Sequence, residues 1–220
     1  MRMSTKHGFA FLCMPKCAST SILTALKEHT NIALRGTPAL KHIDFRTYTK
    51  TVLPLHKLLH PTTEIKTICM IRDPLEWINS WYRYRGREEL KNHRNSTAEI
   101  TYQEFIEEYI SDGKRKPFAD LRTQYNFLRQ KDGGIGPDYV IPMHRLDILS
   151  RLLSERIGED IIFGNKNVSP TMDFSLNNNV ESRLKEFLAN DIAVYNYIER
   201  LGFFDKEKHS QCNFAIHHDD

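Results

Sequence analysis

One short segment combines a lysine with three hydroxyl side chains, which are residue types that bind phosphate or sulfate groups. It comprises, in order, Pro15, Lys16, Cys17, Ala18, Ser19, Thr20 and Ser21. Lys16 would supply a full positive charge, and the hydroxyls would donate hydrogen bonds to anionic oxygens. A capped helix start with Lys16 in solvent explains the same residues equally well. The segment is distinct from a Walker A loop, because the pattern GxxxxGK[ST] is absent.

A second pair, Arg72 and Ser80, could also bind a phosphate. A guanidinium group presents a planar fork of donors that matches a dianionic phosphate, and a hydroxyl adds a further donor. Ser80 lies seven residues beyond Asp73, about two helical turns, so it returns to the same helix face. For the isolated pair, an ion pair of Arg72 with Asp73 or Glu76 is the simpler explanation.

Both segments fall where a strand is expected to lead into a helix. Residues 9–14 and 65–71 are short apolar runs, typical of buried strands. We expect Ser19 or Thr20 to cap the helix after the first strand. Asp73-Pro74-x-Glu76 predicts the second helix start, with a cap, a proline and an acidic residue in the first turn. A helix N-terminus offers free N–H groups and a partial positive charge, so both turns suit anions.

The remaining pattern completes an α/β fold. Helices are expected from Thr101 onward and over residues 119–130, 147–157 and 180–201, and strands over residues 139–143 and 161–163. Strands that alternate with helices predict a central, mainly parallel sheet with helices on both faces. We expect a single domain over residues 1–220, in which residues 83–135 form a mostly helical elaboration.

Two motifs, in this order, resemble the cofactor-binding segments of sulfotransferases that use 3′-phosphoadenosine 5′-phosphosulfate (PAPS). Phe11-Leu-Cys-Met-Pro-Lys-Cys-Ala-Ser-Thr-Ser21 resembles their 5′-phosphosulfate loop. Ile71-Arg-Asp-Pro-Leu-Glu-Trp-Ile-Asn-Ser80 resembles their 3′-phosphate segment, where an arginine and a serine lie eight positions apart. Lys41-His42 resembles a pair that is common between these motifs in the carbohydrate-type branch. The resemblance implies a P-loop-like three-layer fold and PAPS as co-substrate, released as 3′-phosphoadenosine 5′-phosphate (PAP).

The resemblance also implies roles for individual residues. Lys16 would stabilise the leaving 5′-phosphate, which residues 15–21 would hold. Arg72 and Ser80 would bind the 3′-phosphate. The acceptor would attack sulfur in line, and a base would remove its proton. A histidine suits this task because its pKa lies near neutrality, and His42 is our candidate.

Three other side chains near or between the motifs are alternatives to His42 as the base. His56 and His60 lie between the same two motifs, and so does Asp44. By the resemblance, the family needs no metal, and the sequence contains no cluster of metal-ligating residues.

Later segments fit the resemblance less closely. Gln124-Tyr-Asn-Phe-Leu128 resembles a helical stretch before the third strand, Asn167-Val-Ser169 a short motif near the cofactor, and Asp191-x-x-x-Tyr195 the closing helix. Family members often carry a glutamate where this chain has Asp147, two residues after Arg145. The glycine-rich adenine loop of the hormone-type branch is not recognisable.

Composition narrows the class of protein. The chain has 220 residues, a formal net charge of +3 and 40% apolar residues, which is ordinary for a globular protein. The mildly basic balance does not by itself indicate a nucleic-acid partner, and we expect none. The cysteines form no CxxC pair, which favours reduced thiols; they are Cys13, Cys17, Cys69 and Cys212. No apolar run is long enough to span a membrane, so we expect a cytoplasmic enzyme without a membrane anchor.

We therefore expect a sulfotransferase that moves a sulfonate group from PAPS to a hydroxyl or amine of a small-molecule or carbohydrate acceptor. The alternatives are a P-loop small-molecule kinase that uses ATP and magnesium, and a non-catalytic PAP-binding module. Residues 81–87 are aromatic and basic and could hold the acceptor, although an exposed helix end is the interpretation we favour. Residues 83–135 are expected to shape the acceptor pocket. The sequence names no acceptor and specifies no oligomeric state.

Overall fold

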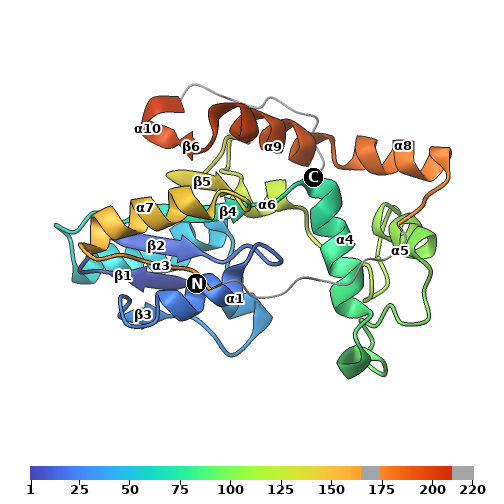
Figure 1. The fold of residues 1–220 in the computed structure, drawn as a ribbon, viewed down its shortest axis with the longest axis horizontal. Helices are drawn as coiled ribbons and strands as arrows, with labels where there is room; N and C mark the ends of the chain where they lie inside the picture. Colours follow the sequence, from blue (N-terminus) through green and yellow to red (C-terminus); the bar gives the residue numbers. More distant parts are fainter. Residues whose placement is uncertain (165–173, 210–220) are drawn as a thin grey trace.

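The computed structural model describes residues 1–164 and 174–209 of the chain. In this part of the chain six strands form one sheet, in the order β3-β1-β2-β4-β5-β6, with helices around it (Figure 1). The strands are β1 (Arg2–Ser4), β2 (Phe9–Leu12), β3 (Ile32–Ala33), β4 (Lys66–Ile71), β5 (Tyr139–Pro142) and β6 (Phe204–Asp205). The chain therefore has an α/β fold, as the sequence predicts.

Three parallel strands, β2, β4 and β5, form the centre of the sheet. All residues of β2 are buried, and so are all residues of β4 except Lys66. Parallel strands are covered on both faces, which explains why these two segments are continuously apolar in the sequence. The carboxyl ends of β2 and β4 lie next to each other, and each is followed within a few residues by a helix.

The outer strands are antiparallel, so the sheet is mixed rather than mainly parallel. β1 pairs with β2 and β3, and β6 pairs with β5. Only residues 5–8 join β1 to β2, which is too short for the crossover that a parallel pair requires. Gly8 in this hairpin has φ +64°, which glycine adopts readily. The three outer strands have two or three residues each, too few to show a period in the sequence.

The helices differ widely in length. They are α1 (Ser19–Ala25), α2 (Pro38–Lys41), α3 (Phe45–Leu59), α4 (Pro74–Arg85), the 3-10 helix η1 (Glu88–Leu90), α5 (Tyr102–Tyr109), α6 (Gln124–Leu128), α7 (Leu146–Ile157), α8 (Asn178–Phe187), α9 (Ala189–Leu201) and α10 (Lys206–His209). Within residues 1–164 and 174–209, none has the length and apolar character needed to cross a membrane.

Several helix ends follow their sequence signals. Asp73 caps α4 by accepting hydrogen bonds from the backbone N–H groups two and three residues further on, at 3.0 and 2.9 Å. Thr101 and Glu104 form a reciprocal capping box at the start of α5. Gly158 ends α7 with φ +87°. The expected start of α4, which carries Ser80, is thus confirmed.

The helix α3 has no counterpart among the expected elements. Most of its side chains are exposed or half-buried, only Tyr48 and His56 are buried, and Pro54 lies in its interior. A polar segment with an internal proline disfavours a helix by sequence pattern alone. Asp44 stabilises the start of α3 by accepting a hydrogen bond from the Thr47 N–H group at 2.7 Å.

Two expected helices have different boundaries. Residues 180–201 form two helices, α8 and α9, that meet at Leu188, instead of one long helix. The helix expected over residues 119–130 is confined to the five residues of α6. Its buried side chains, which include Gln124 and Tyr125, face neighbouring elements, so tertiary contacts set its ends.

Residues 161–163 do not form the expected strand. The backbone N–H of Ile161 donates to the Ser154 hydroxyl at 2.9 Å, and the Ser150 hydroxyl donates to the Ile161 carbonyl. Both serines belong to α7. The backbone of this apolar segment is therefore satisfied by a helix rather than by the sheet.

Helix α4 connects the sheet to a group of helices that includes α5 and α8, which lie away from the strands (Figure 1). Tyr82 of α4 packs against Tyr102 and Phe105 of α5, with ring centroids 5.2 and 5.4 Å apart. The Tyr102 hydroxyl donates to the Asn79 side chain at 2.5 Å. Buried apolar residues of the sheet and of these helices belong to one cluster, so α4 is fixed along its whole length.

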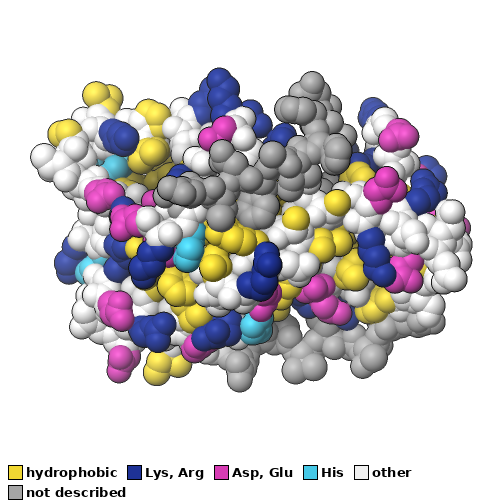
Figure 2. Space-filling view, turned by 90° about the horizontal axis from the view of Figure 1, so that it is seen from above, with side chains coloured by type: hydrophobic (Ala, Val, Ile, Leu, Met, Phe, Trp, Pro, Cys, Tyr) yellow, Lys and Arg dark blue, Asp and Glu magenta, His cyan; other side chains and the backbone are white. Residues whose placement is uncertain are grey.

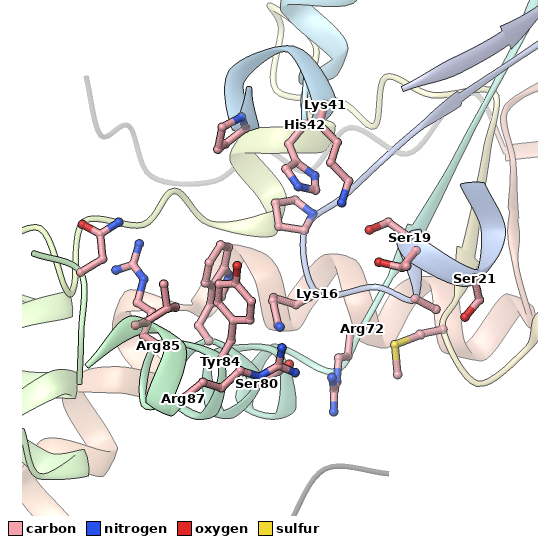
Figure 3. A pocket seen from close by; sticks show the side chains of 18 of the residues that line it. Lys16, Ser19, Ser21, Lys41, His42, Arg72, Ser80, Tyr84, Arg85 and Arg87 are labelled. Atoms are coloured by element: carbon pink, nitrogen blue, oxygen red, sulfur yellow. The ribbon is translucent and has the colours of Figure 1, made fainter. Parts of the chain in front are cut away.

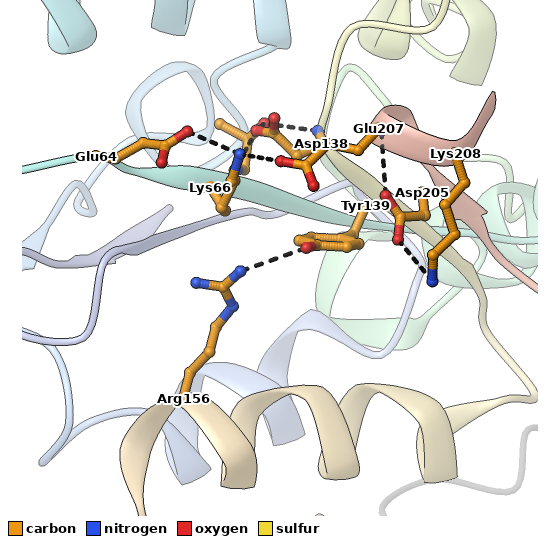
Figure 4. A network of polar contacts seen from close by, with 9 residues as sticks. Glu64, Lys66, Asp138, Tyr139, Arg156, Asp205, Glu207 and Lys208 are labelled. Carbon is orange, nitrogen blue, oxygen red and sulfur yellow. Dashed lines mark hydrogen bonds and ion pairs between the residues drawn. The ribbon is translucent and has the colours of Figure 1, made fainter. Parts of the chain in front are cut away.

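A polar network fastens the opposite edge of the sheet, at the amino ends of β4 and β5 (Figure 4). The Lys66 ammonium lies 2.7 Å from the carboxylates of Glu64 and Glu207. The Asp138 carboxylate accepts a hydrogen bond from the Thr67 N–H group at 2.7 Å. These contacts join β4 to β5 and α10 and leave the carboxyl edge of the strands open to a ligand.

Candidate functional site

A cavity of about 610 Å³ lies where the chain leaves β2, β4 and β5 (Figure 3). Ligands of open α/β sheets bind at this carboxyl edge of the strands. Nine of the ten residues that the sequence singles out line the cavity, namely Pro15, Lys16, Ala18, Ser19, Thr20, Ser21, His42, Arg72 and Ser80. The two motifs, more than fifty residues apart in the sequence, thus contribute to one site.

Cys17 is the one expected site residue outside the lining. Its side chain is buried, and its thiol lies 3.7 Å from the Gln124 side-chain oxygen, to which it donates a weak hydrogen bond. Burial raises the pKa of the Cys17 thiol to about 12. The Cys17 side chain therefore packs into the interior and stabilises the turn, while the neighbouring residues of the turn line the cavity.

The lining is strongly cationic. It contains five lysine and arginine side chains and two histidines, which are Lys16, Lys41, Arg72, Arg85, Arg87, His42 and His93, and no aspartate or glutamate among the described lining residues. On the molecular face seen in Figure 2, by contrast, Lys and Arg side chains are interspersed with Asp and Glu. Like charges gathered in a concave site focus a positive potential, which favours an anionic ligand.

The turn after β2 has an unusual backbone. Lys16 and Ala18 both have positive φ, at +64° and +53°, in the left-handed region that costs roughly 1–2 kcal/mol per non-glycine residue. The Trp77 indole N–H donates to the Pro15 carbonyl at 2.9 Å and helps to hold this conformation. A turn of this kind directs successive N–H groups toward the same side, where they can bind an anion.

The expected side-chain cap of α1 is absent. Ala18 is the N-cap residue, and no side-chain hydrogen bond closes the start of the helix, so the prediction that Ser19 or Thr20 caps it is wrong. The helix begins at Ser19, so the three hydroxyl residues lie within its first turn. Among the described residues none hydrogen-bonds to the hydroxyls of Ser19, Thr20 or Ser21, which leaves them available to a ligand.

Lys16 lies against two aromatic rings. Its ammonium is 4.1 Å from the centroid of the Tyr84 ring and 5.9 Å from that of Trp81. Partial burial, and then the positive charges of Arg87 and other nearby arginines, lower the Lys16 pKa to about 8. The environment of the Lys16 amine therefore disfavours its charged form, and a bound anion would stabilise that form.

Arg72 is positioned through both its backbone and its side chain. The Gln124 side-chain amide accepts from the Arg72 N–H at 3.0 Å and donates to the Arg72 carbonyl at 2.8 Å. The guanidinium donates to Glu76 at 3.2 Å, so the simpler ion pair considered from the sequence exists. Arg72 and the buried Ser80 nevertheless both line the cavity, and Glu76 orients the guanidinium from one side.

Gln124 and Asp191 support both turns from beneath. Gln124 is completely buried and contacts Cys17 of the first turn as well as Arg72 of the second. The Asp191 carboxylate, on α9, accepts the N–H groups of Gln124 and Tyr125 at 2.7 and 3.1 Å. Burial raises the Asp191 pKa to about 6. The sequence indicates both residues only through the resemblance, because their function depends on tertiary contacts.

His42 has the geometry of a base. Its Nδ1 lies 2.7 Å from the Cys13 carbonyl oxygen, and a carbonyl can only accept, so Nδ1 carries the proton. The other nitrogen, Nε2, is then unprotonated in the neutral ring. Burial lowers the His42 pKa, which favours this neutral form near pH 7.

The alternative bases lie elsewhere. His56 is buried in α3 with its Nε2 3.2 Å from the Thr63 carbonyl, and His60 stacks on it with ring centroids 5.3 Å apart. Asp44 caps α3 and accepts a hydrogen bond from Arg122 at 2.6 Å. None of these three residues lines the cavity.

Further lining residues come from the end of α4 and the segment after it. They are Trp81, Tyr84, Arg85, Arg87, Leu90, His93 and Asn95, together with Pro38, Lys41 and Met143 from other segments. The expectation that residues 81–87 form an exposed helix end is only partly correct, because Tyr82 and Arg85 are buried and four of these residues form a wall of the cavity. Sequence alone could not decide this, because a basic and aromatic helix end looks the same on a solvent-facing surface.

Two remaining expectations concern other segments. Arg145 forms an ion pair with both carboxylate oxygens of Asp147, each at 3.0 Å, and neither residue lines the cavity. Residues 167–169, expected near the cofactor, lie outside the described residues. No protein-family model matches the chain, and a search of curated proteins finds no match either.

Proposed function

We propose that the chain is a PAPS-dependent sulfotransferase with a P-loop-like fold, which transfers a sulfonate group to a hydroxyl or amine of its acceptor. The observation that carries this proposal is that two strand-to-helix turns line one cationic cavity without an acidic side chain in its described lining. PAPS carries anionic groups on the 5′ and 3′ positions of its ribose, and each turn offers donors for one of them.

The first turn is proposed to hold the 5′-phosphosulfate. The free N–H groups at the start of α1 and the hydroxyls of residues 19–21 surround the phosphate, and Lys16 lies beside its bridging oxygen. Charge develops on this oxygen in the transition state, where a preorganised ammonium stabilises it most. The lowered Lys16 pKa supports this role, because a poorly solvated cation gains more from a new anionic partner.

The second turn is proposed to bind the 3′-phosphate through Arg72 and Ser80. This phosphate distinguishes PAPS from ATP, so the pair would supply cofactor specificity. The Gln124 amide fixes the Arg72 backbone, and Glu76 restrains the guanidinium, so little side-chain entropy is lost on binding.

The transfer step is an in-line displacement at sulfur. The acceptor oxygen forms a bond to sulfur as the bond from sulfur to the 5′-phosphate oxygen breaks. The electrons of the broken bond stay on that oxygen of PAP, beside Lys16. The acceptor proton passes to His42 Nε2 and then to solvent. The Cys13 carbonyl keeps the imidazole in the required tautomer, since it accepts the Nδ1 proton.

The compartment is proposed to be the cytoplasm. Cys13, Cys17 and Cys69 are buried free thiols, which fits a reducing environment.

Thermal unfolding with PAP, AMP and ATP plus magnesium tests the proposal. A ligand that binds only the folded state stabilises it by mass action, by about 2.7 kcal/mol at a hundred-fold excess over its Kd. We expect PAP to raise the Tm clearly and AMP to raise it much less, because AMP lacks the 3′-phosphate.

The other outcomes separate the alternatives. A Tm increase with ATP and magnesium but none with PAP would overturn the proposal in favour of a kinase. PAP binding without transfer of labelled sulfonate to any acceptor in a broad panel would indicate a non-catalytic PAP-binding module.

A further inference from the structure

The cavity extends well beyond the residues assigned to the donor. In Figure 3, Lys16 lies between two groups of side chains: Ser19, Ser21 and Arg72 on one side, and Tyr84, Arg85 and Arg87 on the other. The first group belongs to the two donor-binding turns. We call the second group, together with His93, the Arg87 subsite, and the proposed donor contacts leave it without a ligand.

The arginines of the Arg87 subsite form no ion pair with any carboxylate in the described part of the chain. Among the described residues, the subsite contains no acidic side chain. The buried Arg85 guanidinium donates to the backbone carbonyls of Pro117 and Phe118, which are neutral, and forms no ion pair among the described residues; only the charge of Asp120, outside the lining, partly offsets it. A subsite of this kind disfavours a cationic ligand and favours an anionic one.

The cationic groups of Lys16 and Arg87 both lie close to the aromatic ring of Tyr84. The centroid of the Tyr84 ring is 4.1 Å from the Lys16 ammonium and 5.1 Å from the Arg87 guanidinium. Trp81 supports Tyr84 in an edge contact, with ring centroids 6.0 Å apart. The charge of Arg87 is the first electrostatic cause of the lowered Lys16 pKa. An oxyanion near this ring would relieve the repulsion between the two cations.

The position of the Arg87 subsite indicates whether its anionic ligand is part of the donor or of the acceptor. In Figure 3, Tyr84 and Arg85 lie on the other side of Lys16 from Ser19, Ser21 and Arg72, whereas Ser80 lies beside Arg87. Lys16 is the residue proposed to stand beside the breaking bond. In an in-line displacement the acceptor approaches sulfur from the side opposite the leaving group. The acceptor, rather than the donor, would therefore occupy the Arg87 subsite.

We propose that the acceptor is a ring compound that bears an oxyanion as well as the reacting hydroxyl, with its ring against Tyr84 and its oxyanion against Arg87. This inference rests on the proposed function and narrows its substrate class. The oxyanion is a carboxylate or a sulfate ester, and the arginine fork binds either one. Neutral alcohols would lack the contact with Arg87 that positions the reacting hydroxyl for attack on sulfur.

Matched glycosides test the inference on the PAP-loaded protein by titration calorimetry. The probes are 4-nitrophenyl glucoside, the corresponding glucuronide and the glucoside 6-sulfate, which differ only at the sixth carbon. We expect the glucuronide, the 6-sulfate or both to bind at least ten-fold more tightly than the neutral glucoside. Whichever anionic probe binds more tightly identifies the oxyanion.

Variants assign the effect to the subsite. Arg87→Ala should abolish the preference for anionic probes and leave PAP affinity within about two-fold. Arg94→Ala removes the same charge from an exposed residue outside the lining and should change neither quantity. Arg87→Lys should restore part of the preference, because it keeps the charge without the fork.

The possible failures are distinguishable. If PAP itself does not bind, the proposed function fails. If PAP binds but anionic and neutral probes bind equally, or neither binds, the acceptor assignment is wrong and the donor site stands. If Arg87→Ala weakens PAP as strongly as the anionic probes, the Arg87 subsite belongs to the donor, which also overturns the assignment.

Discussion

Lys16 combines backbone strain with a disfavoured charge. Its left-handed φ costs free energy that the surrounding fold must offset, and its ammonium is partly removed from water. Contacts with the Tyr84 ring compensate this loss of solvation only in part. Both features are expected where a side chain must be held in place before an anion binds, because a relaxed lysine would spread over many rotamers.

Lys16→Ala should reduce transfer by roughly 10²–10³-fold, the usual effect of removing one transition-state contact, while PAP still binds. Single-turnover transfer of labelled sulfonate and calorimetry with PAP give the two quantities. Lys27→Ala serves as the control, because Lys27 is exposed and its one ion pair among the described residues is with Glu28. An equal loss in the Lys27 variant would mean that net charge, rather than the position of Lys16, matters.

Arg72→Ala should weaken PAP at least ten-fold more than it weakens adenosine 5′-phosphosulfate, because only PAP carries the 3′-phosphate. A lost hydrogen bond to a charged group of about 1.5–3 kcal/mol corresponds to this change. Arg83→Ala is the matched control, since Arg83 also lies near Glu76, at 3.7 Å, but does not line the cavity. Equal weakening of both nucleotides by Arg72→Ala would show that Arg72 is structural.

The pH dependence of kcat/KM should be bell-shaped. On the acidic side, kcat/KM rises as His42 loses its proton; burial lowers the pKa of His42, so this limb lies below pH 6.5. On the alkaline side, kcat/KM falls as Lys16 loses its proton around pH 8. His42→Ala should lower kcat by roughly 10²–10⁴-fold and remove the acidic limb, while the alkaline limb stays. An unchanged acidic limb in this variant would assign the base to another residue.

At the scale of elements, α6 and α9 hold two turns that the sequence separates. Gln124 at the start of α6 contacts Cys17 after β2 and Arg72 after β4, and Asp191 of α9 holds the start of α6. A displacement of α6 would therefore move both halves of the donor site together. This coupling explains why a short helix of five residues is almost entirely buried.

Asp191→Asn should change the pH dependence of stability. The folded-state pKa of Asp191, about 6, is raised above its unfolded value by burial, so its stabilising contribution is full at low pH and is lost as pH rises through 6. Asparagine can accept the same two N–H groups without a charge. Urea unfolding should therefore show the variant gaining stability relative to the parent as the pH rises from below 3.8 to above 6, with no further gain at higher pH.

The gain in unfolding free energy should be about 1.4 kcal/mol for each unit by which folding raises the pKa of Asp191. Comparison of the two proteins at each pH cancels the contributions of all other titrating groups. A difference in unfolding free energy that stays constant from about pH 3 to about pH 7 would contradict a raised Asp191 pKa.

At the scale of the whole molecule, the net charge is small, but positive charge is concentrated in the cavity. The chain carries only +3, yet five lysine and arginine side chains line one cavity without an acidic partner in its described lining. Elsewhere, cations are balanced locally, as at the amino edge of the sheet where Lys66 contacts two glutamates (Figure 4). The electrostatic attraction for an anion is therefore local, and net charge would underestimate it.

PAP affinity should consequently depend on salt. Raising NaCl from about 50 to about 500 mM shortens the screening length to a few ångströms, so the Kd for PAP should rise several-fold. Adenosine, which is uncharged, should bind with an unchanged Kd over the same range. Calorimetry gives both values, and parallel changes for the two ligands would contradict a site dominated by charge.

Several local features of the chain can be predicted from its amino-acid sequence alone. The buried strands β2 and β4, the Asp73 cap and the spacing of Arg72 and Ser80 follow from apolar runs and capping patterns that involve near neighbours. These patterns also placed both candidate anion sites at strand-to-helix turns. Local hydrogen bonds and hydrophobic periods suffice for such predictions, because they involve residues within one or two turns of each other.

Which of these local features come into contact depends on long-range packing. β1 is antiparallel to β2 because a four-residue hairpin joins them, and α3 forms despite Pro54. The tautomer of His42 depends on a carbonyl 29 residues away, and the Gln124 bonds span 52 residues to Arg72. Such contacts join groups far apart in the chain, so no local pattern specifies them, and they convert two separate motifs into one cationic cavity.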